Sequence, residues 1–286
     1  MNLTSEDIEH FDQQGFLIVE QILSLEQVAQ VIESMARVYR GEFTLDRRPQ
    51  HIRAAHKRVW PLGLPDSVQW FLNARVCDGD FWNVATSAEI GRVAATLLHS
   101  PSVSLVEDQL LNKPPQGGRP VKVHRDYSYW TFSKSSEMLT CWMSLVEASV
   151  EMGTLQVIPG SHKWEYVQTL QLNLMDGSEQ GWLSAAEARC PAGTSIELVP
   201  VVVPPGGGVF FHSLTFHGSS RNTSNCVRRA ISLHYASERC RFDVSRVADH
   251  LFPYTFAGLR DGGPLVNRWM PQVYPPRSSR TSTIEK

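Results

Sequence analysis

The stretch "VKVHRDYSYW" (121–130) places His124 and Asp126 two residues apart among the β-branched and aromatic residues that are typical of a strand. On a strand, the side chains of residues i and i+2 project from the same face. An imidazole and a carboxylate could therefore reach one metal ion, while Arg125 points away. Because a His-x-Asp pair is common by chance, a metal site needs a third ligand from elsewhere in the chain.

The candidates for this third ligand lie in "FFHSLTFHGSSRN" (210–222), which contains His212 and His217. Two histidines and one carboxylate are the ligand set that holds non-haem iron(II) and leaves positions open for O₂ and a co-substrate. Zinc also accepts three nitrogen or oxygen ligands, so the ligand types alone leave both metals open. We expect His217 to be the ligand and His212 to lie in the core or beside the site.

Arg228 opens the run "RRAISLHY" (228–235), eleven residues after His217, and we expect this run to be a strand next to the ligand strand. An arginine can bind a carboxylate through two parallel hydrogen bonds, which a lysine does less well. A 2-oxo acid that chelates iron needs such a cation for its far carboxylate. The alternative is that Arg228 and Arg229 merely flank a strand on a solvated edge, and their spacing leaves both interpretations open.

The elements that must position these residues are mostly short strands. From about residue 102, runs such as "VSLVEDQLLN", "LTCWMSLVEA" and "GGVFFHSL" alternate with turns such as "KPPQGG" and "PPGGG". Many short strands with Gly/Pro turns predict a β-sandwich or barrel. Before them, Thr4 predicts a helix that Gly15 ends, Ser24 with Gln27 predicts a capping box, and Thr86 or Ser87 begins a further helix.

Composition and charge exclude several classes of protein. The chain has 286 residues, 42% of them hydrophobic, and a net charge of −2, which gives no indication of a nucleic-acid or membrane partner. The five cysteines are odd in number and the first residues are too polar for a signal peptide. We therefore expect free thiols and a cytoplasmic location. We predict a single domain over 1–274, with insertions at about 41–85 and 163–192, and a polar tail over 275–286.

Five motifs together resemble the phytanoyl-CoA dioxygenase family of iron(II)- and 2-oxoglutarate-dependent oxygenases. They are "QLLNKPP" (109–115), "HRDYSYW" (124–130), "LTCWMSL" (139–145), "GTLQVIPGSHK" (153–163) and "FHGSSRNTSNCVRRAISLHY" (216–235). They follow the family's order and spacing over roughly residues 100–236. The resemblance implies a mainly β fold, a double-stranded β-helix or jelly roll of the cupin type, with N-terminal helices against one sheet.

The resemblance also implies roles for particular residues. His124, Asp126 and His217 match the three iron ligands, and Arg228 matches the arginine that pairs with the distal carboxylate of 2-oxoglutarate. Gln109 and Trp142 match positions that line the co-substrate pocket. Relatives that halogenate carry a small residue at the position of Asp126, so the carboxylate favours oxygen chemistry.

The substrate side is less well defined. Tyr127, Tyr129 and Trp130 follow the ligand pair directly and could form an aromatic wall over the substrate. The segment "RRPQHIRAAHKR" (47–58) has five basic residues and no acid. One hypothesis is that Arg53 and Lys57 bind an anionic group of the substrate, and the alternative is a solvated loop.

The predicted function is therefore the oxidation, by default hydroxylation, of a small molecule. Fe(II), 2-oxoglutarate and O₂ are the expected cofactor and co-substrates, and succinate and CO₂ are the expected products. We favour a substrate of specialised metabolism. Two alternatives remain: a cupin-like enzyme that uses zinc or manganese without a 2-oxo acid, and a non-catalytic jelly-roll binding module.

Overall fold

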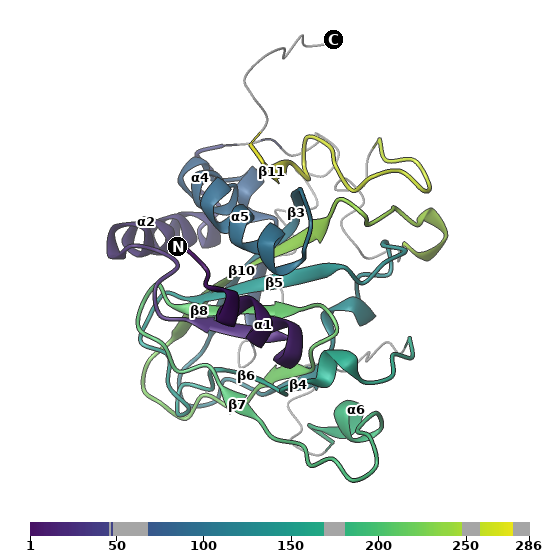
Figure 1. The fold of residues 1–286 in the computed structure, drawn as a ribbon. Helices are drawn as coiled ribbons and strands as arrows, with labels where there is room; N and C mark the ends of the chain where they lie inside the picture. Colours follow the sequence, from purple (N-terminus) through teal and green to yellow (C-terminus); the bar gives the residue numbers. More distant parts are fainter. Residues whose placement is uncertain (46, 48–67, 169–180, 248–257, 277–286) are drawn as a thin grey trace.

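The computed structural model describes residues 1–45, 47, 68–168, 181–247 and 258–276, which form two antiparallel sheets (Figure 1). The seven-stranded sheet has the order β1 (Phe16–Val19), β8 (Gly208–His212), β5 (Met138–Ser144), β10 (Arg228–Ser237), β3 (Val103–Lys113) and β11 (Gln272–Tyr274), with β2 (Gln69–Leu72) also paired to β3. The four-stranded sheet has the order β4 (Val121–His124), β9 (His217–Ser219), β6 (Leu155–Val157) and β7 (Val199–Pro200). This arrangement confirms the predicted double-stranded β-helix.

The helices lie mainly on one face of the large sheet (Figure 1). They are α1 (Ser5–Gln14), α2 (Leu25–Tyr39), α4 (Gly79–Ala85) and α5 (Ala88–Leu97), while the short α6 (Ser184–Glu187) lies beside the small sheet. The predicted helix starts are confirmed: Thr4 and Ser24 form capping boxes, and Ser87 rather than Thr86 caps α5. No helix among the described residues is long and apolar enough to cross a membrane.

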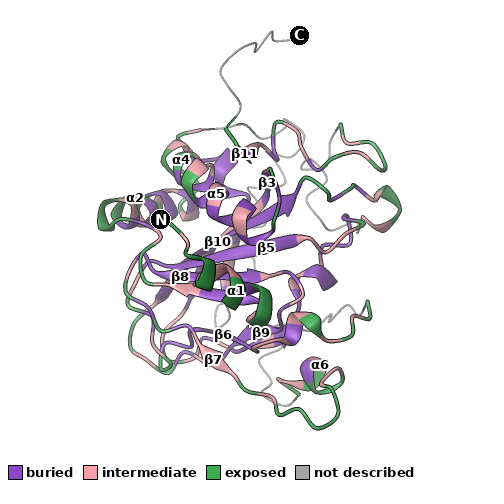
Figure 2. Cartoon of the chain, in the orientation of Figure 1, coloured by how far each residue is buried: buried purple, intermediate pink, exposed green. Residues whose placement is uncertain are grey.

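Most strands of the two sheets are buried (Figure 2). The alternation of side chains along them gives two apolar layers. On β5, Leu139 and Cys141 pack under the helices, whereas Trp142 belongs to the cluster between the two sheets. Cys141 is one of five cysteines that are all free thiols, as predicted. The face of the large sheet that looks toward the small sheet carries the polar residues discussed below.

The segment 68–85, which the sequence analysis assigned to the first insertion, is part of this scaffold. It contributes β2, the 3₁₀ helix η1 (Ala74–Val76) and α4. Arg75 and Asp108 form an ion pair whose side chains are both fully buried, and Arg75 also donates to the backbone carbonyl of Trp269. The pair joins η1 to β3. The strand β2 has only four residues, and Arg75 lies three residues after its end. So short a stretch gives no periodic signal, and the sequence pattern therefore did not reveal this scaffold role.

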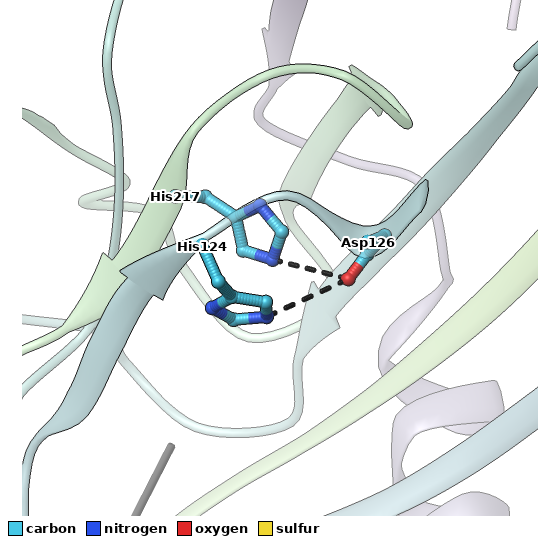
Figure 3. Close-up of side chains that lie close together, drawn as sticks. All are labelled: His124, Asp126 and His217. Atoms are coloured by element: carbon cyan, nitrogen blue, oxygen red, sulfur yellow. Dashed lines mark ion pairs between the residues drawn. The ribbon is translucent and has the colours of Figure 1, made fainter. Parts of the chain in front are cut away.

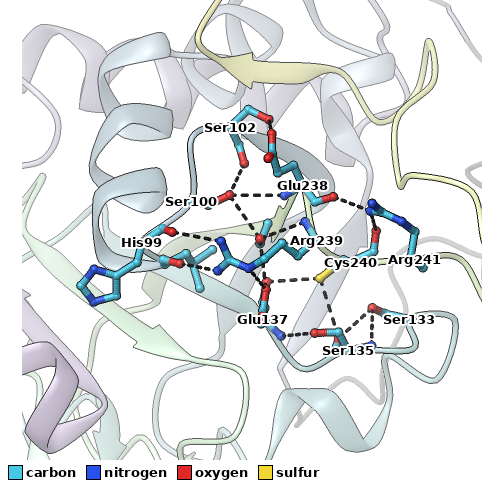
Figure 4. A network of polar contacts seen from close by, with 12 residues as sticks. His99, Ser100, Ser102, Ser133, Ser135, Glu137, Glu238, Arg239, Cys240 and Arg241 are labelled. Carbon is cyan, nitrogen blue, oxygen red and sulfur yellow. Dashed lines mark hydrogen bonds and ion pairs between the residues drawn. The ribbon is translucent and has the colours of Figure 1, made fainter.

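A network of polar contacts lies at the end of the large sheet, next to the last residues of β10 (Figure 4). Arg239 donates to the carboxylate of Glu137 at 2.5 Å and to the backbone carbonyls of Leu98 and His99 at 2.9 and 3.0 Å. Those carbonyls belong to the C-terminal end of α5, where a cation is favoured by the helix dipole. The network therefore ties α5 to the strands that carry the site.

Candidate metal centre

Three side chains converge between the two sheets (Figure 3). Among the described residues, His124, Asp126 and His217 form the group whose possible ligand atoms all lie within 4.8 Å of one another. Asp126 Oδ1 lies 3.6 Å from His124 Nε2 and 3.4 Å from His217 Nε2. Two metal–ligand bonds of about 2.1 Å that meet at roughly 90–120° place their ligand atoms roughly 3.0–3.6 Å apart. The spacing therefore fits one metal ion.

Antiparallel pairing brings the two histidines together. His124 ends β4 and is the direct partner of His217 at the start of β9, with the ring centroids 4.3 Å apart. Asp126 is positioned differently from the prediction, because the strand ends at His124 and Asp126 begins the 3₁₀ helix η2 (Asp126–Ser128). The expectation of one strand face carrying both residues is thus wrong. A tight turn, rather than i, i+2 alternation, aims the carboxylate at the histidines.

Hydrogen bonds fix which nitrogen of each histidine is available. His124 Nδ1 donates to the carbonyl of Lys122 at 2.8 Å, and His217 Nδ1 donates to the carbonyl of Thr215 at 3.0 Å. Each Nε2 is then an unprotonated lone pair that faces the common centre. Burial, together with the neighbouring His217, lowers the pKa of His124, so its ring is neutral at pH 7.

Asp126 is oriented by Thr140 on β5. Thr140 Oγ1 donates to Asp126 Oδ2 at 2.6 Å, which leaves Oδ1 directed at the two histidines. Burial would raise the pKa of Asp126, but its closeness to His217 and His124 holds it well below its usual value. The centre therefore presents one carboxylate oxygen and two imidazole nitrogens, a donor set that fits iron(II) and that zinc would also accept.

Arg228 lies in the opposing sheet, not beside the ligand strands as the sequence analysis assumed. It opens β10, and its Nη1 donates to the carbonyl of Gly153 on the other side of the barrel. Its guanidinium lies 5.8 Å from the centre of the Trp142 ring, and its Nε has no hydrogen-bond partner among the described residues. Burial lowers its pKa to about 10, so Arg228 is a buried cation and not a residue of a solvated edge.

The structure adds Lys113, which lies in the motif "QLLNKPP" and to which the sequence assigned no role. Lys113 ends β3 directly opposite Arg228 and is fully buried. Its Nζ donates to Ser219 Oγ at 2.8 Å and to the carbonyl of Ser220. Burial and the nearby Arg228 lower its pKa well below the usual value. The signal was present in the sequence, because residues 109, 111 and 113 alternate onto one face of the strand.

Neither buried cation has an acidic partner among the described residues. Taking an unpaired charge out of water costs several kcal/mol, which proteins offset with a counter-ion. Lys113 and Arg228 are thus adjacent buried basic groups that a bound anion would stabilise, and they lie between the same two sheets as the three metal-ligand candidates.

The other predicted residues fall into two groups. Gln109 and Trp142 share the inward face, where Gln109 Nε2 donates to Glu107 at 2.9 Å and Trp142 packs under Arg228. His212 lies apart from the centre, since its Nδ1 accepts from the amide of Leu214 and burial lowers its pKa to about 4. Its exclusion from the ligand group agrees with the prediction.

The three aromatic residues after the ligand pair have different environments. Tyr127 is buried and donates to the carbonyl of Ser133, so it packs rather than faces the centre. Tyr129 contacts the His124 ring edge-on at 5.7 Å, and Trp130 contacts His234 at 4.9 Å. Arg53 and Lys57 lie outside the described residues.

A recess of about 300 Å³ that includes open solvent lies against His124. Tyr129, Arg189 and Phe216 are among the residues that line it. Arg189, in the second predicted insertion, is a lining residue that the sequence analysis missed, because nothing in "SAAEARC" marks it as part of a site.

Comparisons with known proteins agree with this geometry. The profile of the phytanoyl-CoA dioxygenase family matches residues 11–230. The peroxisomal phytanoyl-CoA dioxygenase of Bos taurus is 26% identical over 264 residues, which cover 84% of this chain and 70% of the bovine protein. The human enzyme is also 26% identical, over 273 residues, with the same coverage of 84% and 70%.

Solved structures share the fold. The alpha-ketoglutarate-dependent carbocyclase SnoK from nogalamycin biosynthesis superposes with a TM-score of 0.73 at 23% identity, covering 95% of this chain and 96% of SnoK. EctD from S. alaskensis, solved with 2-oxoglutarate and 5-hydroxyectoine, has a TM-score of 0.67 at 20% identity, covering 92% and 85%. The family match, together with the fold and the three metal-ligand candidates, places the protein in the class of non-haem iron, 2-oxoglutarate-dependent oxygenases. Within this class, the chain belongs to the phytanoyl-CoA dioxygenase family.

Proposed function

We propose that this protein oxidises, by default hydroxylates, a small molecule with consumption of O₂ and 2-oxoglutarate and release of succinate and CO₂. One observation carries the proposal: three ligand atoms within 4.8 Å of one another share the space between the sheets with a pair of buried cations that lacks an acidic partner. A metal site alone would fit many enzymes. A metal site beside an anion site fits a metal-chelating dicarboxylate.

In this proposal, Nε2 of His124, Nε2 of His217 and Oδ1 of Asp126 hold Fe(II). When bound, the iron supplies the activation of O₂ and the removal of hydrogen from a substrate carbon. The protein holds the three ligands in place through the bonds from Nδ1 of each histidine and from Thr140 to Asp126. Three protein ligands leave coordination positions for the co-substrates.

The far carboxylate of 2-oxoglutarate would lie between Arg228 and Lys113. The guanidinium supplies parallel donors, and the ammonium supplies a point charge. Because both cations are already desolvated, the carboxylate gains strong interactions without further dehydration of the protein. The same feature disfavours the cupin-like alternative, in which no 2-oxo acid would neutralise the pair.

We further propose that the substrate reaches the centre through the recess beside His124, where Tyr129 contacts the ligand ring. In this proposal, Trp130 packs against the His234 ring and covers that side of the barrel interior. The relation to SnoK supports a substrate of specialised metabolism. A small molecule is thus the proposed partner, with no nucleic acid or membrane, and the location is proposed to be cytoplasmic, although several relatives are named as peroxisomal.

The decisive experiment is an anaerobic titration of the metal-free protein with Fe(II) and then with 2-oxoglutarate. We expect the visible charge-transfer band of an iron-chelated 2-oxo acid, followed by succinate formation when air is admitted. His217→Ala should abolish the band, whereas the control His99→Ala, at an exposed position, should keep it. A wild-type protein that binds iron without developing the band would refute the co-substrate, and a band in His217→Ala would refute the site.

A further inference from the structure

A row of polar residues crosses the inward face of the large sheet next to the metal-ligand candidates. Glu107 on β3 is the direct partner of His234 on β10, and His234 is the direct partner of Thr140 on β5. Thr140 in turn donates to Asp126. The row therefore leads from a metal-ligand candidate across the interior of the barrel to a carboxyl group that neither the metal nor the 2-oxoglutarate site uses.

The hydrogen bonds along this row define the state of His234. Thr140 has a single hydroxyl hydrogen, which it donates to the carboxylate of Asp126. Thr140 Oγ1 must then accept from His234 Nδ1, 2.9 Å away, so His234 carries its hydrogen on Nδ1. Its Nε2 is left as a bare acceptor. This residue is only 3% exposed, and its Nε2 has no hydrogen-bond partner among the described residues.

Glu107 presents a second acceptor to the same space. Its Oε1 accepts from Gln109 Nε2 at 2.9 Å and lies 3.8 Å from His234 Nε2, which is too far for a hydrogen bond. The Glu107 side chain is 18% exposed, so it remains accessible from the interior. Its direction follows from the register, because Lys113, on the same face of β3, contacts Ser219 of the opposing sheet.

The electrostatics agree with this geometry. Burial raises the pKa of Glu107 to about 7 and lowers the pKa of His234 to about 4. His234 is therefore neutral under physiological conditions, and Glu107 can be an acceptor or a donor. Trp130 contacts the His234 ring edge-on and closes one side of this space.

We propose that Glu107 and His234 form a hydrogen-bonding subsite for an O–H or N–H group of the substrate, close to the metal. The inference rests on the proposed function. A hydroxyl group can donate to His234 Nε2 while it accepts from protonated Glu107, and a primary amine can donate to both residues at once. A purely hydrocarbon group would leave the buried Nε2 of His234 without a donor, which a binding site strongly disfavours. The substrate class is thus an alcohol or an amine rather than a hydrocarbon.

The test uses three matched series of probes, on pentyl, cyclohexyl and decalin skeletons, each as the hydrocarbon, the alcohol and the primary amine. Binding is read anaerobically, as the change that each probe causes in the visible band of the Fe(II)–2-oxoglutarate complex. Substrate-stimulated succinate release is the second readout. We expect the alcohol or the amine of at least one series to bind roughly tenfold or more tightly than its hydrocarbon.

Variants of Glu107 assign the preference to this subsite. Glu107→Leu should reduce the difference between the polar probe and its hydrocarbon, while the control Glu165→Gln, at an exposed position, should keep it. Glu107→Gln keeps an acceptor oxygen and adds a donor but carries no charge, so it should keep the preference for an alcohol and weaken the preference for a charged amine. Equal or absent responses to all probes, or an unchanged preference in Glu107→Leu, would overturn the proposal. If wild type lacks the visible band and probe-independent succinate release, the proposed function itself has failed.

Discussion

Replacing Lys113 with methionine separates the two roles that a buried lysine could have. If the anion that Lys113 serves is a co-substrate, Lys113→Met should weaken its binding without destabilising the empty protein. A hydrogen bond to a charged group contributes about 1.5–3 kcal/mol, so the dissociation constant of 2-oxoglutarate should rise roughly 10- to 150-fold. If Lys113 instead served a buried ion pair within the protein, its loss would cost about 3–5 kcal/mol of stability.

The magnitude for the empty protein follows from two opposing effects. Methionine removes a buried amine whose charged form is disfavoured beside Arg228, which is stabilising, but it leaves Ser219 and the carbonyl of Ser220 without a donor. Each effect is on the order of 1–3 kcal/mol, so the unfolding free energy should change by less than about 1 kcal/mol. The corresponding shift of the unfolding temperature is at most about 4 °C.

Calorimetric titration of 2-oxoglutarate into the anaerobic Fe(II) protein measures the first effect, and thermal unfolding without iron and co-substrate measures the second. Lys163→Met, at an exposed position, is the matched control and should change neither quantity. Unaltered 2-oxoglutarate affinity in Lys113→Met would refute the anion site. A fall of the unfolding temperature by about 6 °C or more would point to an internal partner for the lysine instead.

Three further predictions concern the centre and its surroundings. Thr140→Val should lower the affinity for Fe(II) roughly 10- to 100-fold in a competition titration, whereas Thr140→Ser, which keeps the hydroxyl, should not. Equal Fe(II) affinities of wild type and Thr140→Val would show that the contact with Asp126 has no orienting role. His217→Asn should abolish iron binding and His212→Asn should leave it unchanged, measured as bound metal per chain. The pKa of Glu107 is raised to about 7 from its usual 4.5, so its contribution to stability is complete below about pH 4.5 and is lost as the pH rises through 7. Glu107→Gln should therefore gain up to about 3 kcal/mol relative to wild type between pH 4.5 and 8, measured by metal-free denaturant unfolding, and a pH-independent difference would contradict the shift.

The sequence predicted the kind of fold and the residues of the centre, because both depend on local features. Helix starts follow from capping residues such as Thr4 and Ser24, and strands follow from runs of β-branched and aromatic residues. The ligand types of the centre were likewise visible in two short motifs. The local geometry was not: a 3₁₀ turn after His124 aims the carboxylate of Asp126, and residue periodicity carries no information about where such a turn begins.

What the sequence did not reveal depends on long-range register. Arg228 was expected beside the ligand strands but lies across the barrel, because only strand order decides which sheet a residue joins. The roles of Lys113 and Glu107 depend on their partners on β10, which are more than one hundred residues away in the chain. Their burial, and hence their shifted pKa values, likewise follows from packing that no single motif encodes.

Strand β3 is polar on both faces, and this restricts how the barrel can assemble. Toward the helices it carries Asp108, which is paired with Arg75; toward the interior it carries Glu107, Gln109 and Lys113. A slip of one residue against β10 would exchange the two faces, moving the lysine under the helices and leaving Arg75 without its carboxylate. Such a slip would thus bury several unmatched charges at once. The ion pair between Arg75 and Asp108 therefore favours the register in which Glu107, Gln109 and Lys113 face the interior.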